Sequence, residues 1–104
     1  MSEKKNVLKD KSFSFAIRII NLYKYLTAAK NEYVLSKQLL RSGTAVGALV
    51  RESQNAESKA DFIHKLAVAK KECDESLYWI ELLFQTDYLL STEYGIINNE
   101  ATEI

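Results

Sequence analysis

The segment from Leu35 to Leu83 constrains the fold most, because its apolar residues recur at spacings of three and four without a single proline. In its first part, one helix face carries Leu35, Leu39, Ser42, Val46 and Leu49. In its second part, one face carries Phe62, Leu66, Ala69, Cys73, Ser76, Ile80 and Leu83. This is the period of an α-helix, not the alternation of a strand. A polar run at 54–58 interrupts the pattern, so the segment predicts a helical hairpin.

The remaining segments predict two helices that cover this hairpin. We expect an all-α, antiparallel up-down four-helix bundle, as one domain over residues 1–104, with a short or truncated fourth helix. The expected helices are 12–30, 33–55, a third from a Ser58 cap to residue 85 or 86, and 93–103. Ser58 with Asp61 resembles a capping box. The other expected N-caps are Asp10 or Ser12 for the first helix, and Ser91 or Thr92 for the last.

Composition limits the classes of protein that this chain can join. Its 104 residues, 47% of them hydrophobic, suffice for one modest core. No apolar run reaches the roughly 18 residues of a membrane span, and the polar start lacks the apolar core of a secretion signal. A single cysteine excludes an internal disulfide. A reducing cytoplasm is therefore the predicted compartment, without a membrane partner.

The expected first helix is apolar over most of its circumference. One stripe carries Phe15, Ile19, Leu22, Leu26 and Ala29, and a second carries Phe13, Ala16, Ile17, Ile20 and Tyr23. A helix of this kind is buried on more than one side, which predicts a homo-oligomer. Tyr78, Trp79 and Leu82 form another apolar face on the expected third helix. This face is either a satellite core or a subunit interface, and its aromatic residues favour the interface. The predicted interface residues are Phe15, Ile19, Tyr78, Trp79 and Leu82.

Two glycines lie four residues apart inside the expected second helix. Gly43 and Gly47 each cost up to about 1 kcal/mol of helix propensity relative to alanine. Close approach of a neighbouring helix is the usual compensation, and a contact with a ligand is the less expected alternative. The spacing therefore predicts tight helix packing at this point.

One set of polar residues suggests either structure or chemistry. It consists of Arg41, Arg51, Glu52, Glu72 and Glu75. These residues form an interhelical ion-pair network that sets the helix register, or simply lie on solvated faces, or Glu52, Glu72 and Glu75 supply an enzyme or metal site. The network is favoured, because no phosphate-binding loop or other catalytic motif accompanies the carboxylates. We therefore predict no enzyme, no cofactor and no small-molecule substrate.

The single histidine and the single cysteine do not strengthen the chemical alternative. His64 and Asp61 share one helix turn, but di-iron bundles need a second histidine and carboxylates from other helices. Cys73 lies on the core stripe, where a thiol acts as a small hydrophobe. It is nine residues from His64 on the same helix, about 13 Å at about 1.5 Å per residue. A Cys–His pair within one subunit and a metal site are therefore not predicted.

Charge is distributed unevenly along a chain whose formal net charge is zero. Residues 1–52 hold ten Lys or Arg and four Asp or Glu, and residues 53–104 hold four and ten, which gives +6 and −6. Either the basic side of one subunit meets the acidic side of the next, or it contacts nucleic-acid phosphates. The candidate phosphate-binding residues are Lys4, Lys5, Lys9, Lys11, Arg18, Lys24 and Lys30.

An ordered set of residues resembles a known family. Its elements are Gln38-Leu39-Leu40-Arg41-Ser42, Gly47-Ala48, Arg51-Glu52, Asn55-Ala56, Asp61-Phe62, Lys65-Leu66, Ala69, Glu72, Glu75 and Tyr78-Trp79. They are similar to the four-helix-bundle proteins encoded by intervening sequences of bacterial 23S rRNA genes. The resemblance implies an up-down bundle and a homopentameric ring, a suspected role in nucleic-acid binding, and no established enzymatic activity. The predicted function is a non-enzymatic oligomeric scaffold with weak RNA or DNA binding.

The sequence departs from that family in two places. Ala45 and Leu49 stand where the family tends to place serine and asparagine, so polar contacts made there by relatives are absent. In the family the fourth helix also continues beyond the position of Ile104. We therefore expect part of the third-helix surface to lack its cover.

Overall fold

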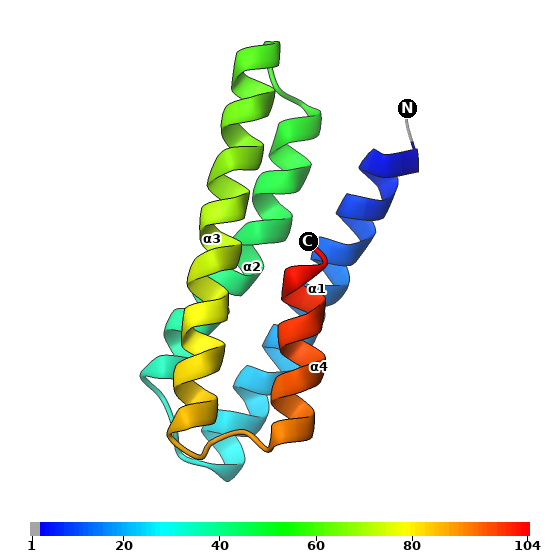
Figure 1. Cartoon of the computed structure of the whole chain (residues 1–104). Helices are drawn as coiled ribbons and strands as arrows, with labels where there is room; N and C mark the ends of the chain where they lie inside the picture. The colour runs from blue at the N-terminus through cyan, green and yellow to red at the C-terminus, as the bar shows by residue number, and fades with distance from the viewer. Residues whose placement is uncertain (1–2) are drawn as a thin grey trace.

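The computed structural model describes the backbone of residues 3–104 and the side chains of residues 7–104. It contains four helices, which run alternately up and down (Figure 1): α1 (Glu3–Ala29), α2 (Leu35–Gln54), α3 (Lys59–Gln85) and α4 (Ser91–Thr102). The described residues form no strand. The prediction of an all-α four-helix bundle with a short fourth helix is confirmed.

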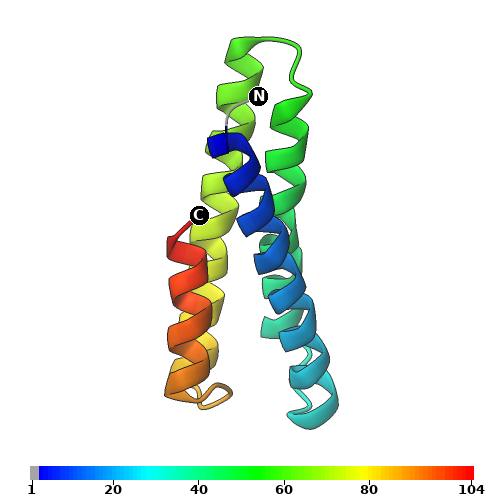
Figure 2. The same ribbon diagram turned by 90° about the vertical axis from the view of Figure 1, so that its right-hand side faces the viewer.

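Each helix packs against its neighbours in sequence, and α1 closes the bundle against α4. Because α4 has 12 residues and α3 has 27, α4 covers only about half of α3 (Figure 2). Beyond the end of α4, a cavity of about 160 Å³ lies among Leu8, Val50, Leu66 and Ile104. Leu66 is therefore only half-buried, although it lies on the same face of α3 as Ala69 and Cys73.

Helix α1 begins nine residues before its predicted start, so both proposed N-caps are wrong. The added segment holds four Lys with one Glu and one Leu, all of them good helix formers. Ser12 lies inside the helix and is 1% exposed, and its hydroxyl donates to the carbonyl of Lys9 at 3.1 Å. Such a bond to the preceding turn satisfies a serine within a helix without ending it.

Glu32 begins α2 by capping it from the preceding loop, a role not seen in the sequence. Its carboxylate accepts hydrogen bonds from the backbone N–H groups of Val34, Leu35 and Ser36, at 3.2, 3.0 and 2.8 Å. The Ser36 hydroxyl donates back to the Glu32 carbonyl at 2.8 Å. Burial raises the pKa of the Glu32 carboxyl, but the backbone donors outweigh burial, so the net pKa is lowered.

This cap makes the stability of the fold depend on pH. A carboxyl whose pKa is lowered by folding stabilises the protein above its unfolded pKa of about 4.3, and this contribution is lost as pH falls through the folded pKa. Glu32→Gln should therefore lower the unfolding free energy by about 1 kcal/mol at pH 7, and by much less near pH 3. Urea unfolding followed by circular dichroism measures the difference. Glu57→Gln, an exposed matched control, should change neither value, and an equal loss for Glu32→Gln at both pH values would contradict the role.

The two other helix starts differ in their agreement with the sequence. The Ser58 hydroxyl accepts from the N–H of Asp61 at 3.0 Å, which confirms the predicted cap of α3. Neither Ser91 nor Thr92 caps α4, contrary to prediction. Instead Glu93 accepts from the N–H of Leu90 at 2.8 Å. The Glu93 carboxylate satisfies one free N–H group at the start of α4. Its negative charge also suits the positive end of the helix dipole.

The core joins the apolar stripes of all four helices. Its members include Phe15, Ile19, Leu26, Leu39, Val46, Cys73, Ile80, Leu83, Ile97 and Ala101. A Cβ added at Gly43 would lie 2.8 Å from Cγ1 of Ile19, and one added at Gly47 would lie 3.3 Å from the Ser12 carbonyl oxygen. The predicted close packing at the two glycines is confirmed, because α1 occupies the space that side chains would take.

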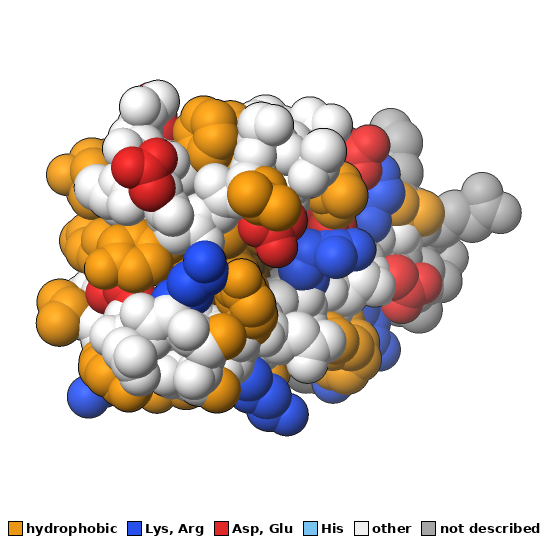
Figure 3. Space-filling view, turned by 90° about the horizontal axis from the view of Figure 1, so that it is seen from below, with side chains coloured by type: hydrophobic (Ala, Val, Ile, Leu, Met, Phe, Trp, Pro, Cys, Tyr) orange, Lys and Arg blue, Asp and Glu red, His pale blue; other side chains and the backbone are white. Residues whose placement is uncertain are grey.

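Figure 3 views the bundle from the end that carries the α1–α2 and α3–α4 loops. Tyr33, Val34 and Leu90 in these loops are exposed. Hydrophobic side chains and charges of both signs are interspersed on this face (Figure 3), so it presents no field of a single sign. Within residues 3–104, no helix combines the length and the apolar character needed to cross a membrane.

Candidate functional site

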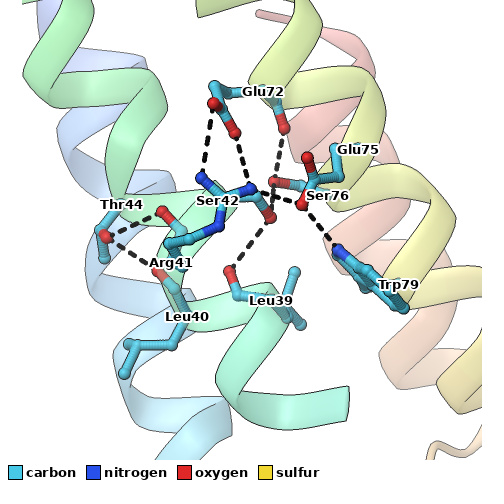
Figure 4. Close-up of polar contacts among 9 residues, drawn as sticks. All are labelled: Leu39, Leu40, Arg41, Ser42, Thr44, Glu72, Glu75, Ser76 and Trp79. Atoms are coloured by element: carbon cyan, nitrogen blue, oxygen red, sulfur yellow. Dashed lines mark hydrogen bonds and ion pairs between the residues drawn. The ribbon is translucent and has the colours of Figure 1, made fainter.

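The most concentrated polar site lies across α2 and α3, where Arg41 stands between two carboxylates (Figure 4). Its Nη2 is 2.5 Å from Glu75 Oε2 and 3.1 Å from Glu72 Oε1, and its Nη1 donates to Glu72 Oε2 at 3.4 Å. The indole N–H of Trp79 also donates to Glu75 Oε2, at 3.0 Å. One guanidinium therefore connects two successive turns of α3 to α2.

The electrostatics of this cluster oppose acid–base catalysis. Donation from Trp79, followed by that from Arg41, lowers the pKa of the Glu75 carboxyl. The hydrogen bonds that the Arg41 guanidinium donates to Glu72 and Glu75 raise the pKa of Arg41. A general acid or base at neutral pH needs a pKa shifted toward 7, whereas Glu75 is shifted away from it. The arrangement suits a structural ion pair at a partly exposed position, of a type worth about 0–1 kcal/mol.

A buried pair of serines lies beside the Arg41 cluster. The hydroxyl oxygens of Ser42 and Ser76 are 2.9 Å apart, and Ser76 Oγ is also 2.9 Å from the Glu72 carbonyl. Each hydroxyl has one hydrogen, so both contacts form if Ser42 donates to Ser76 and Ser76 donates to Glu72. The two small side chains let α2 and α3 approach closely while satisfying their own polar groups.

The structure divides the predicted five-residue polar network. Arg41, Glu72 and Glu75 meet as expected, but Glu52 pairs with Lys65 at 3.1 Å. The Arg51 guanidinium lies over the Phe13 ring, 5.0 Å from its centroid, on the α1 side of α2. A single network of all five residues is therefore wrong.

The same division separates the three carboxylates of the chemical alternative. Lys65, the α3 residue that pairs with Glu52, is seven residues from Glu72, about 10 Å along the helix. Within residues 7–104, no group of three His, Cys, Asp or Glu side chains is placed to hold a metal ion. Cys73 is buried, its thiol donates to the Ala101 carbonyl at 3.2 Å, and burial raises its pKa. The thiolate needed for nucleophilic chemistry is therefore disfavoured.

The structure distributes the candidate phosphate-binding residues around α1. Lys4 and Lys5 lie outside the described side chains. Arg18 forms an ion pair with Glu100 of α4, and Lys11 shares a small cavity with Glu100 and Glu103. At about 100° per residue, Lys24 lies about 120° and Lys9 about 180° around α1 from Arg18, and Lys30 follows the end of the helix at Ala29. The cations of α1 therefore do not form one continuous patch.

The predicted interface residues also separate into two groups. Phe15 and Ile19 are 0% exposed because they fill the core of a single subunit, so their placement at a subunit interface is corrected. Phe13, Ile17 and Ile20 of the second stripe are exposed instead. This exposed second stripe is an apolar face of α1 that the subunit's own core does not cover.

The α3 face is partly exposed and partly packed against the subunit's own core, which Trp79 contacts. Tyr78 is 56% exposed, and Trp79 and Leu82 are half-buried. The Tyr78 and Trp79 rings meet edge to face, with centroids 5.1 Å apart. The role of Glu75 in holding Trp79 was missed, although their spacing of four residues on one helix places them side by side.

Comparison with known proteins extends over nearly the whole chain. A family model described as 23S rRNA-intervening sequence protein matches residues 4–104. The chain is also similar to the crystal structure, at 1.70 Å resolution, of a protein with unknown function from the S23 ribosomal protein family of Bacteroides thetaiotaomicron. The two sequences are 55% identical over 96% of this chain and 89% of that chain, with a TM-score of 0.95. None of the curated proteins matches the chain.

Proposed function

Because the chain belongs to the family of 23S rRNA-intervening sequence proteins, we propose that it is a non-enzymatic scaffold that assembles with copies of itself and binds RNA or DNA weakly. Membership confirms the family resemblance seen in the sequence. The family is one of unknown function, so the proposal depends on the surface of this chain. The family resemblance further favours a closed ring of five subunits.

The exposed second stripe of α1 carries the proposal of assembly. Phe13 is 51% exposed and Ile17 46%, and Ile20 lies beside them on the same helix face. Single exposed hydrophobic residues are common, but a continuous apolar stripe on a helix is typical of a protein contact. The core of the subunit is already filled by Phe15 and Ile19, so this stripe has no role inside it.

The polar clusters support a scaffold rather than an enzyme. Glu75 is held ionised between Arg41 and Trp79, and Glu52 is engaged by Lys65 on the surface. The Glu75 arrangement supplies no carboxylic acid tuned to donate or accept a proton near pH 7. Both ion pairs connect α2 to α3, so a role in fixing the register of these two helices accounts for them.

Nucleic-acid binding is supported by where the charge lies in the fold. Helices α1 and α2 are neighbours and carry nine of the 14 Lys and Arg but three of the 14 Asp and Glu, whereas α3 and α4 carry seven of the 14 Asp and Glu. Lys24 and Lys30 are exposed and form no ion pair within residues 7–104. Scattered lysines contact phosphates without reading bases, so the binding should be weak and independent of sequence.

One pair of measurements tests this proposal at about 50 and 200 mM salt: light scattering, and fluorescence anisotropy with a generic single-stranded RNA. We expect a mass several times the 11.9 kDa of the chain at both concentrations. If binding neutralises about four phosphates, with a slope of about −0.7 per phosphate, RNA affinity at about 200 mM salt should be about 50-fold lower than at about 50 mM.

A matched pair of double variants locates the binding surface. Lys24→Gln with Lys30→Gln should weaken RNA binding at low salt. Lys59→Gln with Lys71→Gln removes the same charge from α3 and should not. If RNA binding is undetectable at low salt while the oligomer dissociates at high salt, the charges serve assembly and the nucleic-acid proposal fails.

A further inference from the structure

Helices α1 and α2 border an outward-facing groove of about 260 Å³, here called the α1–α2 groove. Phe13, Ala16 and Ile20 line it from α1, and Thr44, Ala48 and Arg51 line it from α2. Gly47 also lies in its lining, and the small side chains of Ala16 and Ala48 leave the groove open. Arg51 is the one charged residue of the lining, and its guanidinium lies over the Phe13 ring.

A complementary surface lies on α3, here called the α3 ridge and consisting of Tyr78, Glu81 and Leu82. Tyr78 projects from the helix, and Trp79 supports its ring from the side. Glu81 lies one turn from Tyr78 and, unlike Asp74 and Glu75, forms no ion pair within residues 7–104. The ridge therefore combines an aromatic projection with an unpaired negative charge.

We propose that the α3 ridge of one subunit docks into the α1–α2 groove of a second copy of this chain. The Tyr78 ring enters the groove beside Ala48, and the Glu81 carboxylate pairs with Arg51. This inference rests on the proposed self-assembly and specifies the two surfaces that meet. A tyrosine at the centre and an arginine beside it are the residue types enriched at energetically important contacts.

Charge favours this pairing over contact between two identical grooves. Two grooves facing each other would bring two positively charged linings together, which costs free energy. Groove and ridge carry opposite charges, as do the two halves of the sequence. Because the two surfaces differ, the contact is heterologous and repeats from subunit to subunit until a ring closes.

Cross-linking between two tagged forms of the full chain tests the docking. One form carries Ala48→Cys and the other Tyr78→Cys, and both are mixed and treated with a short bis-maleimide. The native Cys73 is 2% exposed and should not react. We expect cross-links between the two forms and none between copies of Ala48→Cys alone. Ile63→Cys is a matched control for Tyr78→Cys, since the two native side chains are 55% and 56% exposed on the same helix.

Light scattering on the same samples separates the two levels of the proposal. An oligomer in which Ala48→Cys reacts as well with Ile63→Cys as with Tyr78→Cys, or reacts mainly with itself, overturns the docking but leaves self-assembly intact. A monomer of the unsubstituted chain, measured in parallel, overturns both. Arg51→Glu should weaken assembly about tenfold or more, and adding Glu81→Arg to the same chain should restore it. Failure of this restoration would also overturn the pairing.

Discussion

Phe15→Ala should lower the unfolding free energy by about 3–5 kcal/mol, the range typical of removing a fully buried phenylalanine. The Phe15 ring is completely buried among the core residues of its own subunit, so its loss leaves a cavity inside the bundle. Urea unfolding followed by circular dichroism measures the change. The loss should be the same at protein concentrations that differ a hundredfold.

Phe13→Ala is the matched control, because it removes the same side chain two residues earlier on the same helix. Phe13 is exposed in the subunit and contacts Arg51. Removal of the Phe13 ring should lower the unfolding free energy of the isolated subunit much less and should act mainly on assembly. Its effect should therefore be larger at protein concentrations at which the subunits associate. If Phe15→Ala instead showed the concentration dependence expected of Phe13→Ala, the assignment of the two stripes would have to be reversed.

Gly43→Leu should destabilise the fold by about 2–3 kcal/mol, although leucine is the better helix former. The first added carbon would lie within 2.8 Å of Ile19, whose branched side chain is fixed inside the core. To accommodate the leucine, α1 would have to move away from α2. The same unfolding measurement detects the loss.

Gly95→Leu provides the opposite case, because a Cβ at Gly95 meets nothing within 4 Å. There the gain in helix propensity should dominate and stabilise the protein by about 0.5–1 kcal/mol. Effects of the same sign at both positions would mean that helix propensity, and not the approach of α1, determines the cost at Gly43.

The polar contacts between α2 and α3 were partly within reach of the sequence. In an antiparallel hairpin, residues equally far from the loop face each other, and Arg41 and Glu72 each lie 14 residues from the loop ends Asn55 and Ser58. By the same rule Glu52 faces the start of α3 and not Glu72. Applying this register to the sequence would have separated Glu52 from the other carboxylates.

What the sequence determined by itself was local. The spacing of apolar residues predicted four helices, Ser58 predicted the start of α3, and the paired glycines predicted a close helix contact, because each signal lies within about two turns of chain. Tertiary structure alone decided which of two apolar stripes on α1 faces inward. Both stripes are apolar, and the choice depends on how α1 rotates to fit Ile19 against Gly43. It also decided that Arg18 pairs with Glu100 and that Arg51 covers Phe13, since such contacts depend on the relative rotation and register of different helices, which the periodicity of a single helix does not contain.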